Sequence, residues 1–496
     1  MFRRLVVLAC SLALGLAPLL VAGNDLPDIG NPSDTVLSRD MEQQIGRSIY
    51  KSLRDTGKVV TDPELQEYIQ DIGQKIAANA TDNGQRFRFF IVDDAAINAF
   101  ALPGGYVGVH SGLLLATANE SELAGVLAHE ISHVTQRHIS RAIHANSRAS
   151  ILTMAALLGA ILLGAATGSG DAIQGALAAA QGAAAQQQIN FTRSNEYEAD
   201  RVGIGLMASA GFDPDAMASF FNTLARQSGP LASAAPEFLR THPVTVNRVA
   251  EARERAAQFP RTGEEARSTT GYGLARARLR LLASPTPESA LAYFTSQQKD
   301  PAHAGTLGTE YGLALAELRA GQAKQAAEAF AGLVAGNPGV IPFHSGLAAA
   351  QMASGDEQAA FASYEHAVSL FPRNVPLTIH YAEALMQRGR AKEAHKILLD
   401  LLNIVPPTPE QVRLIALAAS AAGDTADAHY YMAEYHLMAG DLGLAADELR
   451  IALGMPGLDS VQKARFGSRL SEIQEVLTRL QAEKRMSQPR NPESGS

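Results

Sequence analysis

The first part of the chain carries two stretches with helical spacing of apolar residues, at 37–56 and 63–79. The second stretch opens with Thr61-Asp62-Pro63-Glu64, in which a capping residue precedes a proline and an acid in the first turn. These residue types favour the start of a helix. We therefore expect helices over both ranges, preceded by an extended leader that ends near residue 35.

The pattern then becomes typical of strands. Residues 86–92 (RFRFFIV) are rich in aromatic and β-branched side chains and predict a strand. Over residues 98–112, short apolar runs flank Pro103-Gly104-Gly105, which predicts a hairpin. A helix is expected from about Asn119 to beyond His138, because acidic residues occupy its first turn, where the helix dipole stabilises them.

In the second half, four columns of residues recur in register every 34 positions. This period is typical of tetratricopeptide repeats, in which glycine ends one helix, a small alanine lets the paired helices approach, and a bulky residue fills the gap between them. The columns are Gly321, Gly355, Gly389 and Gly423; Ala326, Ala360, Ala394 and Ala428; Pro338, Pro372 and Pro406; and Phe330, Tyr364 and Leu398. We expect at least three full repeats and a fourth from about residue 408, with helices at 431–453 and 459–484 that continue or cap the array.

The two ends of the chain have their own patterns. Residues 1–23 have the layout of a secretory signal peptide, with two arginines, an apolar run and a small-residue end. An uncleaved membrane anchor is the alternative, as is a lipid attached to Cys10, the only cysteine. After cleavage the chain has no thiol, which excludes disulfide scaffolding and cysteine catalysis. The tail at 486–496 is expected to be disordered, because it has no apolar residue from Gln488 onward.

Composition narrows the choice of partners. Of 496 residues, 46% are hydrophobic and 19% are charged, which is ordinary for a globular protein. The formal net charge of -8 is mild, and no block rich in lysine or arginine is present in the sequence. These features argue against a nucleic-acid partner.

The sequence His129-Glu130-Ile131-Ser132-His133 falls within the expected helix. Residues four apart share one helix face, so both imidazoles can reach one metal ion while Glu130 lies beside them to accept a proton. A chance match on a surface helix is the alternative, and only a third ligand can exclude it. A histidine six residues after His133 would be one such ligand, but that position is Ile139. We interpret His138 as structural, since it faces away from His133 on an ideal helix.

A second segment offers the third ligand. Glu196 and Asp200 are four apart on another expected helix, so Glu196 can bind metal while Asp200 accepts a hydrogen bond from a liganding imidazole. Glu198 points to the opposite side and is expected to be solvated. The alternative is a plain acidic helix start, and spacing alone does not separate the two.

This combination resembles the gluzincin metallopeptidase family that includes the CAAX prenyl proteases and the HtpX heat-shock proteases. In that family, H-E-x-x-H is followed some sixty residues later by E-x-x-A-D, as it is here. The resemblance implies one Zn²⁺ per chain, Glu130 as general base and Asp200 as a support for a ligand. It makes His129, His133 and Glu196 the zinc ligands. It also implies a substrate-binding strand at Asn98, Ala99, Phe100, Ala101 and Leu102.

Two further residues enter through the same resemblance. Arg240-Thr241-His242-Pro243, followed by Arg248, resembles the late His/Arg segment of the family. The resemblance implies that His242 and Arg248 are catalytic, because a cation or N–H donor near zinc would stabilise an oxyanion. His242 could instead bind zinc as a fourth ligand and give a latent enzyme, and a structural role is the third alternative.

Residues 149–170 are uncharged and long enough to span a membrane. One crossing would place Glu196 and His129 on opposite sides of the bilayer, and the weakly apolar 172–189 is a poor return span. We therefore expect a helical hairpin that packs on the protein or makes peripheral contact with a membrane surface.

A signal peptide, this catalytic domain and a repeat tail together resemble the periplasmic members of the family in Gram-negative bacteria. The resemblance implies a zinc-dependent endopeptidase of the periplasm that acts in quality control of outer-membrane β-barrel proteins. Its clients would be unfolded or stalled outer-membrane proteins, and the repeats would dock on the barrel-assembly machinery. The alternatives are a repeat-based scaffold or chaperone with latent or minor proteolysis, and a purely structural zinc site.

The expected fold is mainly α, with an α+β zinc-metallopeptidase domain, helical with a small sheet, followed by an all-α tetratricopeptide-repeat solenoid. Its predicted parts are a signal peptide at 1–23, the metalloprotease domain at 24–262, a helical connector at 263–303, the solenoid at 304–485 and the tail at 486–496.

Overall fold

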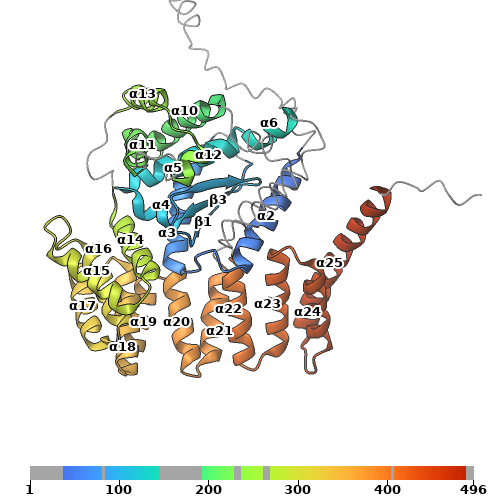
Figure 1. Cartoon of the computed structure of the whole chain (residues 1–496). Coiled ribbons are helices and arrows are strands. Elements are labelled where there is room, and N and C mark those ends of the chain that lie inside the picture. Colours follow the sequence, from blue (N-terminus) through green and yellow to red (C-terminus); the bar gives the residue numbers. More distant parts are fainter. Residues whose placement is uncertain are drawn as a thin grey trace, which may run out of the picture.

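The computed structural model contains an N-terminal part with a small sheet and, below it in Figure 1, an array of paired helices. This mainly α architecture with one three-stranded sheet confirms the predicted fold class. The predictions for 1–23 and 149–170, and for all but the first two residues of the tail, lie outside the described residues. The structure describes residues 37–80, 84–145, 193–227, 236–260, 268–403 and 407–487.

The sheet has the strand order β1-β3-β2. Strand β1 (Arg88–Val92) pairs in parallel with β3 (Tyr106–His110), and β2 (Ala99–Leu102) pairs antiparallel with β3. The β2–β3 turn contains Gly104 and Gly105 at φ +77° and +81°, a backbone region that disfavours side chains. The predicted hairpin is confirmed, and it leaves β2 as an edge strand of the sheet.

Alternation along the strands separates two apolar layers. Phe90 and Val92 contact helix α2 (Arg39–Asp55), whereas Phe89 and Ile91 face the main core. That core includes α3 (Pro63–Ala77), α4 (Ser111–Ala116) and α5 (Glu120–Thr135). Asp62 caps α3 by accepting a hydrogen bond from Leu65 N–H. The sheet is therefore covered on both faces, with α5 deepest in the core.

The predicted helix running past His138 is wrong, because α5 ends at Thr135. Arg137 adopts φ +54°, and a separate helix α6 (His138–Ala145) begins directly after it. The Arg137 side chain is held by the Leu37 carbonyl, at 3.0 Å, and by the Glu42 carboxylate, at 3.2 Å. These buried contacts stabilise a left-handed backbone conformation that is uncommon outside glycine.

Helix α10 (Arg193–Ser209) crosses α5 at close range. A Cβ on Gly203 would lie 3.2 Å from the Ala128 backbone, which is tighter than ordinary packing, so a side chain here would crowd the crossing of the two helices. This crossing places the helix that carries Glu196 and Asp200 beside the helix that carries His129 and His133. The remaining helices of this part are α11 (Asp215–Gln227), α12 (Glu237–Thr241) and α13 (Val246–Ala256).

The C-terminal array consists of antiparallel helix pairs. All four glycines of the 34-residue column have positive φ, between +74° and +89°, at the turn inside each pair. The predicted repeats are therefore present. The helices are α14 (Thr270–Ala283), α15 (Pro287–Lys299), α16 (Leu307–Arg319), α17 (Ala323–Gly336), α18 (Ile341–Ala353), α19 (Glu357–Leu370), α20 (Val375–Gln387), α21 (Ala391–Leu402), α22 (Pro409–Ala421), α23 (Thr425–Met438), α24 (Leu442–Gly454) and α25 (Ser460–Ser487).

Two details of the array differ from expectation. A single helix over 431–453 is wrong, because Gly440 at φ +83° ends α23 and Asp441 caps α24. The predicted connector at 263–303 contains α14 and α15, which share an apolar core with α16 and α17. The pair α14–α15 therefore packs as part of the array, while the exact domain boundaries stay predictions.

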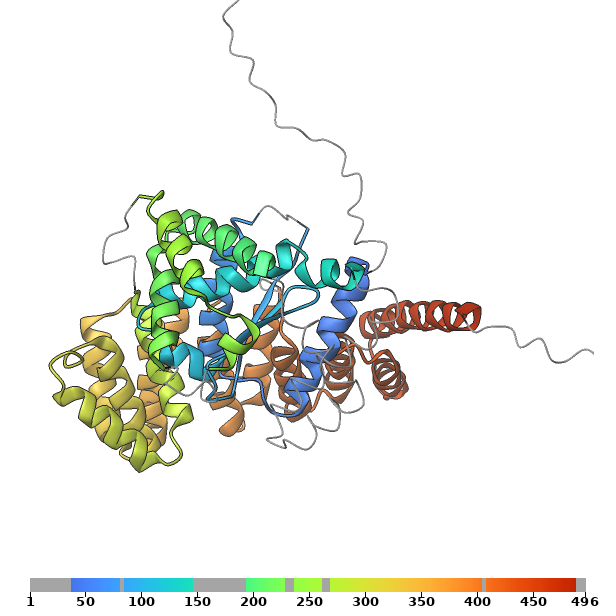
Figure 2. The same ribbon diagram turned by 45° about the horizontal axis from the view of Figure 1, so that its top comes forward.

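Helices α14 and α20 of the array pack against α3 of the N-terminal part, and Figure 2 shows the two parts from a second direction. Arg278 on α14 pairs with Asp62 and Glu64, and His380 on α20 lies 2.8 Å from Glu64. Burial raises the pKa of Glu64, but His380 and Arg278 outweigh this effect and lower the pKa to about 2. Burial lowers the pKa of His380, but Glu64 raises it to about 9. These groups form an ionic contact between the two parts.

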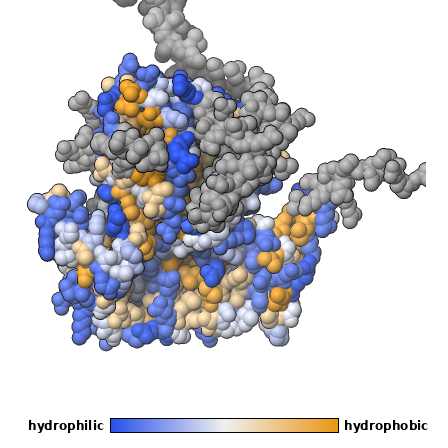
Figure 3. All heavy atoms as spheres, viewed as in Figure 1, coloured by the Kyte–Doolittle hydropathy of each residue, from blue (hydrophilic) through white to orange (hydrophobic). Residues whose placement is uncertain are grey.

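The visible surface is mixed in polarity (Figure 3). Exposed apolar side chains occur on the last two helices, at Leu444, Ile451, Val461 and Val476. Among the helices in the described ranges, none combines the length and apolarity that a membrane crossing needs.

Candidate metal centre

Helix α5 presents both histidines of the H-E-x-x-H segment to one point. The Nε2 atoms of His129 and His133 lie 3.0 Å apart, and each side chain is no more than 2% exposed. Every residue from Glu120 to His133 is buried, so this segment of the helix does not lie at the protein surface. A surface coincidence, the alternative to a metal site, does not fit this burial.

Glu196 on α10 completes a three-residue cluster. Its carboxylate oxygens lie 3.5 Å from His129 Nε2 and 3.6 Å from His133 Nε2. Ligands about 2.0–2.1 Å from a tetrahedral zinc ion lie about 3.3 Å from one another, so these separations match the edges of such a tetrahedron. Burial raises the pKa of Glu196, but His242 and His129 together hold it well below its usual range. The carboxylate is therefore anionic, as a metal ligand must be.

His242 contributes a fourth donor atom at the end of α12. Its Nδ1 lies 3.3 Å from His129 Nε2 and 3.1 Å from Glu196 Oε1, and its side chain is buried. Ligand atoms of His129, His133, Glu196 and His242 all lie within 4.8 Å of one another. The donor set of three imidazoles and one carboxylate suits Zn²⁺.

Asp200 and Arg248 support the cluster from behind. Asp200 Oδ1 lies 3.0 Å from His129 Nδ1, so the carboxylate faces the ring nitrogen opposite the one that would bind the metal. Arg248 on α13 donates from Nε and Nη2 to both Asp200 oxygens, at 2.7 and 2.8 Å. Its Nη1 also lies 2.9 Å from Glu196 Oε2. Arg248 therefore contacts a ligand and its support, and its side chain is only 2% exposed.

Glu130 lies beside the cluster and against strand β2. Its Oε1 is buried and has no hydrogen-bond partner among the described residues, and it lies 3.5 Å from His242 Nε2. Burial raises the pKa of Glu130, although His242 and His129 act against this effect. The Ala101 backbone also acts to lower this pKa, since strand β2 lies beside the carboxylate. A buried carboxylate with a raised pKa is better matched to accepting a proton near neutral pH than an exposed one.

Edge strand β2 runs along this site. Because the His110 N–H donates to the Asn98 carbonyl, Asn98, Phe100 and Leu102 face β3, and the backbone groups of Ala99 and Ala101 point to the outer edge. The Phe238 N–H on α12 donates to the Ile97 carbonyl, so the segment that carries His242 touches the beginning of the same edge.

The interpretation of His138 as facing away from His133 is wrong. Because the chain turns at Arg137, His138 Nδ1 lies 2.8 Å from His133 Nδ1. Its Nε2 lies 3.2 Å from the Glu198 carboxylate. Burial lowers the pKa of His138 to about 4, so the neutral ring can accept from His133 and donate to Glu198. His138 thus orients the second liganding imidazole.

Glu198, expected to be solvated, instead accepts from His138 and from Arg141 at 2.9 Å. Its side chain is 24% exposed, so it is only partly solvated. The sequence contains no signal for the turn at Arg137 that creates this chain of contacts. Gly203 has a weak signal in the sequence, because it lies two helical turns after Glu196 on the same helix.

A buried H-E-x-x-H helix, a glutamate from a second helix and an uncoordinated glutamate base define a zinc metallopeptidase. Comparison with known proteins agrees. Residues 63–256 match Peptidase family M48, and residues 351–418 match the tetratricopeptide repeat family. M48 peptidases are zinc-dependent, which bears out the zinc prediction.

The chain is 38% identical to the putative beta-barrel assembly-enhancing protease of Vibrio cholerae, covering 91% of this chain and 93% of that protein. It is 32% identical to the beta-barrel assembly-enhancing protease of Escherichia coli K12, covering 97% and 99%. The mitochondrial metalloendopeptidase OMA1 of Saccharomyces cerevisiae is 31% identical over 43% of this chain and 63% of its own length. The chain belongs to the family of beta-barrel assembly-enhancing proteases. The predicted family and enzyme class are confirmed.

Proposed function

We propose that this zinc metalloendopeptidase works in the periplasm, where it degrades outer-membrane β-barrel proteins that stall during assembly. The names of its relatives and its paired domains support this role. The observation that carries the catalytic part is the spacing of the His129, His133 and Glu196 donor atoms, which fits one tetrahedral ion.

The roles of the other site residues follow from their contacts. A bound zinc ion would supply Lewis-acid chemistry that polarises the scissile carbonyl and acidifies the attacking water. Glu130 accepts the proton of that water at its unpartnered Oε1 and then donates it to the leaving amine. Asp200 and Arg248 hold His129 and Glu196 in place, which makes Arg248 a positioning residue rather than an oxyanion donor.

Strand β2 is the proposed substrate platform. An extended polypeptide that pairs with the outward groups of Ala99 and Ala101 would run directly past Glu130. Asn98, Phe100 and Leu102 alternate with them and pair with β3. Because edge pairing uses backbone groups, the site would accept any extended chain and no folded one.

His242 is proposed as a gate. Its Nδ1 stands at the fourth corner of the donor set, where water would otherwise enter. Replacing His242 with alanine would therefore raise cleavage of an unfolded substrate severalfold. A loss of cleavage would support the alternative, in which His242 stabilises the transition state. No change would remove His242 from the site.

The Glu130→Gln variant tests the enzymatic role. The isosteric amide cannot accept a proton, so cleavage of unfolded casein by the mature protein should fall at least about a hundredfold. Zinc content should remain at one per chain, since Glu130 is not a ligand. A variant that still cleaves at the wild-type rate would contradict the assignment.

The same variant distinguishes a mainly proteolytic function from a scaffold or chaperone function. A repeat array offers a surface for proteins, so a scaffold or chaperone with minor proteolysis is the second candidate function. Cells carrying Glu130→Gln should accumulate stalled barrel proteins if proteolysis is the main role. If every cellular effect of the wild type persists, the scaffold function is favoured.

Docking of the repeats on the barrel-assembly machinery and peripheral membrane contact through 149–170 complete the proposal. Crosslinking from the array in intact cells tests the first. Release of the mature chain from membranes by alkali tests the second, because an integral protein would resist it.

A further inference from the structure

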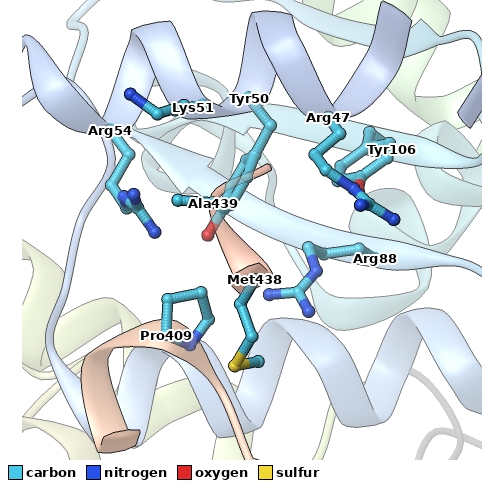
Figure 4. Close-up of a pocket in the computed structure, with 9 residues that line it drawn as sticks. All are labelled: Arg47, Tyr50, Lys51, Arg54, Arg88, Tyr106, Pro409, Met438 and Ala439. Carbon is cyan, nitrogen blue, oxygen red and sulfur yellow. The ribbon is translucent and has the colours of Figure 1, made fainter. Parts of the chain in front are cut away.

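A small pocket lies where the two parts of the chain meet, far along the sequence from the zinc ligands. Helix α2 contributes Arg47, Tyr50, Lys51 and Arg54, and the sheet contributes Arg88 and Tyr106. The start of α22 and the end of α23 close the pocket from the array. Figure 4 shows the Arg54 and Arg88 side chains reaching toward the Tyr50 hydroxyl from α2 and β1. The pocket is therefore built from both parts and lined by four cations.

These cations are only partly neutralised. Lys51 pairs with Asp55 at 2.6 Å, and Arg54 lies 3.4 Å from Asp55 and 3.7 Å from Glu410. Within the described ranges, neither Arg47 nor Arg88 lies within ion-pair distance of a carboxylate. Four cations thus face two carboxylates in a protein whose formal net charge is -8.

The surroundings do not supply the missing charge. Burial raises the pKa of Tyr50, so the hydroxyl stays protonated and can donate a hydrogen bond. The Arg88 guanidinium lies 5.5 Å from the centre of the Tyr50 ring, and its charge acts to lower the pKa of the Tyr50 hydroxyl. The carboxyl end of α23, at Met438 and Ala439, adds a partial negative charge of about half a unit, which is too small to balance two guanidinium groups.

The size of the pocket limits what it can hold. The space open to water-sized groups is about 30 Å³. A water needs about 10–15 Å³ on this measure, so two or three water-sized groups fit. A carboxylate has this size and accepts two hydrogen bonds in the plane that an arginine fork presents.

We propose that this pocket binds a single carboxylate carried by a polypeptide, with Arg47 and Arg88 as its main donors. Polypeptide is the material that this enzyme handles, and its only common anions are carboxylates. Because α22 and α23 close the pocket, an acidic group bound there would contact the catalytic part and the array together. The inference requires the chain to be a peptidase but not that its clients are outer-membrane proteins.

Calorimetric titration of the full-length mature, zinc-loaded Glu130→Gln protein tests the proposal, since that protein should not cleave the probe. The probes are three capped hexapeptides of glycine and serine: one with a central glutamate and an amidated end, one with a central glutamine and a free carboxylate end, and one with neither carboxylate. Inorganic phosphate is the fourth probe. The first two peptides distinguish a side chain from a chain terminus as the source of the carboxylate.

We expect one or both of the carboxylate peptides to bind at least about tenfold more tightly than the neutral peptide, because charge-assisted hydrogen bonds are the strong ones. Arg88→Gln or Arg47→Gln should abolish that preference, and Arg88→Lys should retain part of it. Arg86→Gln is the matched control: Arg86 is exposed, lies two residues from Arg88 and does not line the pocket. It should leave binding unchanged.

Glu410→Gln gives a test of opposite sign. It removes a carboxylate that competes for Arg54, so carboxylate peptides should bind more tightly than to the parent protein. Equal binding of charged and neutral peptides would overturn the proposal. Equal effects of Arg86→Gln and Arg88→Gln, or tight binding of phosphate alone, would also overturn it.

Discussion

Replacing Arg248 with methionine separates a positioning role from a catalytic one. The guanidinium donates to both oxygens of Asp200 and lies 2.9 Å from Glu196, and all three side chains are no more than 7% exposed. Methionine keeps the length of the side chain but offers no donor. The variant therefore removes the arginine cation from both carboxylates and leaves buried Asp200 without a positively charged partner on its outer side.

The magnitude follows from that burial. Removing one partner of a buried ion pair costs about 3–5 kcal/mol, because the remaining charge stays desolvated. In a domain of this size, about 1 kcal/mol lowers Tm by about 2–4 °C, so a loss of about 4 kcal/mol predicts a fall of roughly 8–16 °C. Zinc affinity should fall by about 10–100-fold as well, because His129 and Glu196 lose their support.

Differential scanning calorimetry of the zinc-loaded mature protein measures the shift. Arg253→Met is the matched control, because Arg253 lies on the same helix α13 and is exposed. The control should move Tm by less than about 2 °C. The opposite outcome is that Arg248→Met has the same Tm as the control, keeps its zinc and shows only a lower kcat. That result would mean that Arg248 acts on the transition state, and it would refute the positioning role.

Two other predictions follow from the contacts. His138→Ala should weaken zinc binding by about 10–100-fold in a chelator competition, whereas Arg141→Ala, which touches only the outer end of that chain, should change it less than twofold. The raised pKa of His380, about 9 against an unfolded value near 6.5, means that its pairing with Glu64 is fully present below pH 6.5 and is lost as pH rises through 9. Between these pH values, the free energy of unfolding measured in urea should fall by about 2 kcal/mol more for the wild type than for His380→Gln. This figure is discounted because the His380 side chain is 21% exposed. Parallel pH profiles of the two proteins would contradict this.

Periodicity made the array predictable from the sequence. The turn inside each helix pair needs a residue at φ above +70°, which glycine adopts without steric cost. The 34-residue column of glycines therefore marks these turns directly. The same rule would have split the helix expected over 431–453, because Gly440 adopts φ +83°. That glycine lies outside the 34-residue column, so the repeat period does not mark it.

The metal ligands were predictable because their spacing is local. His129 and His133 share a helix face by geometry alone, and Glu196 and Asp200 do so on a second helix. What joined the two helices was the family resemblance, since no local pattern predicts that α10 crosses α5 at Gly203.

The failures were long-range. The turn at Arg137 depends on Glu42 and the Leu37 carbonyl, about a hundred residues away in the sequence. An ideal helix continued through Arg137 would turn His138 away from His133, whereas the turn brings the two rings together. The parallel pairing of β1 with β3 also escaped prediction, because strand order is set by tertiary packing and not by the residues of the hairpin.

The most direct test of the zinc centre is anomalous diffraction at the zinc absorption edge from crystals of the mature protein. The account predicts one peak per chain, about 2.0–2.2 Å from the Nε2 atoms of His129 and His133 and from a carboxylate oxygen of Glu196. No peak at this position, or a metal held by the two histidines with Glu196 turned away, would contradict it.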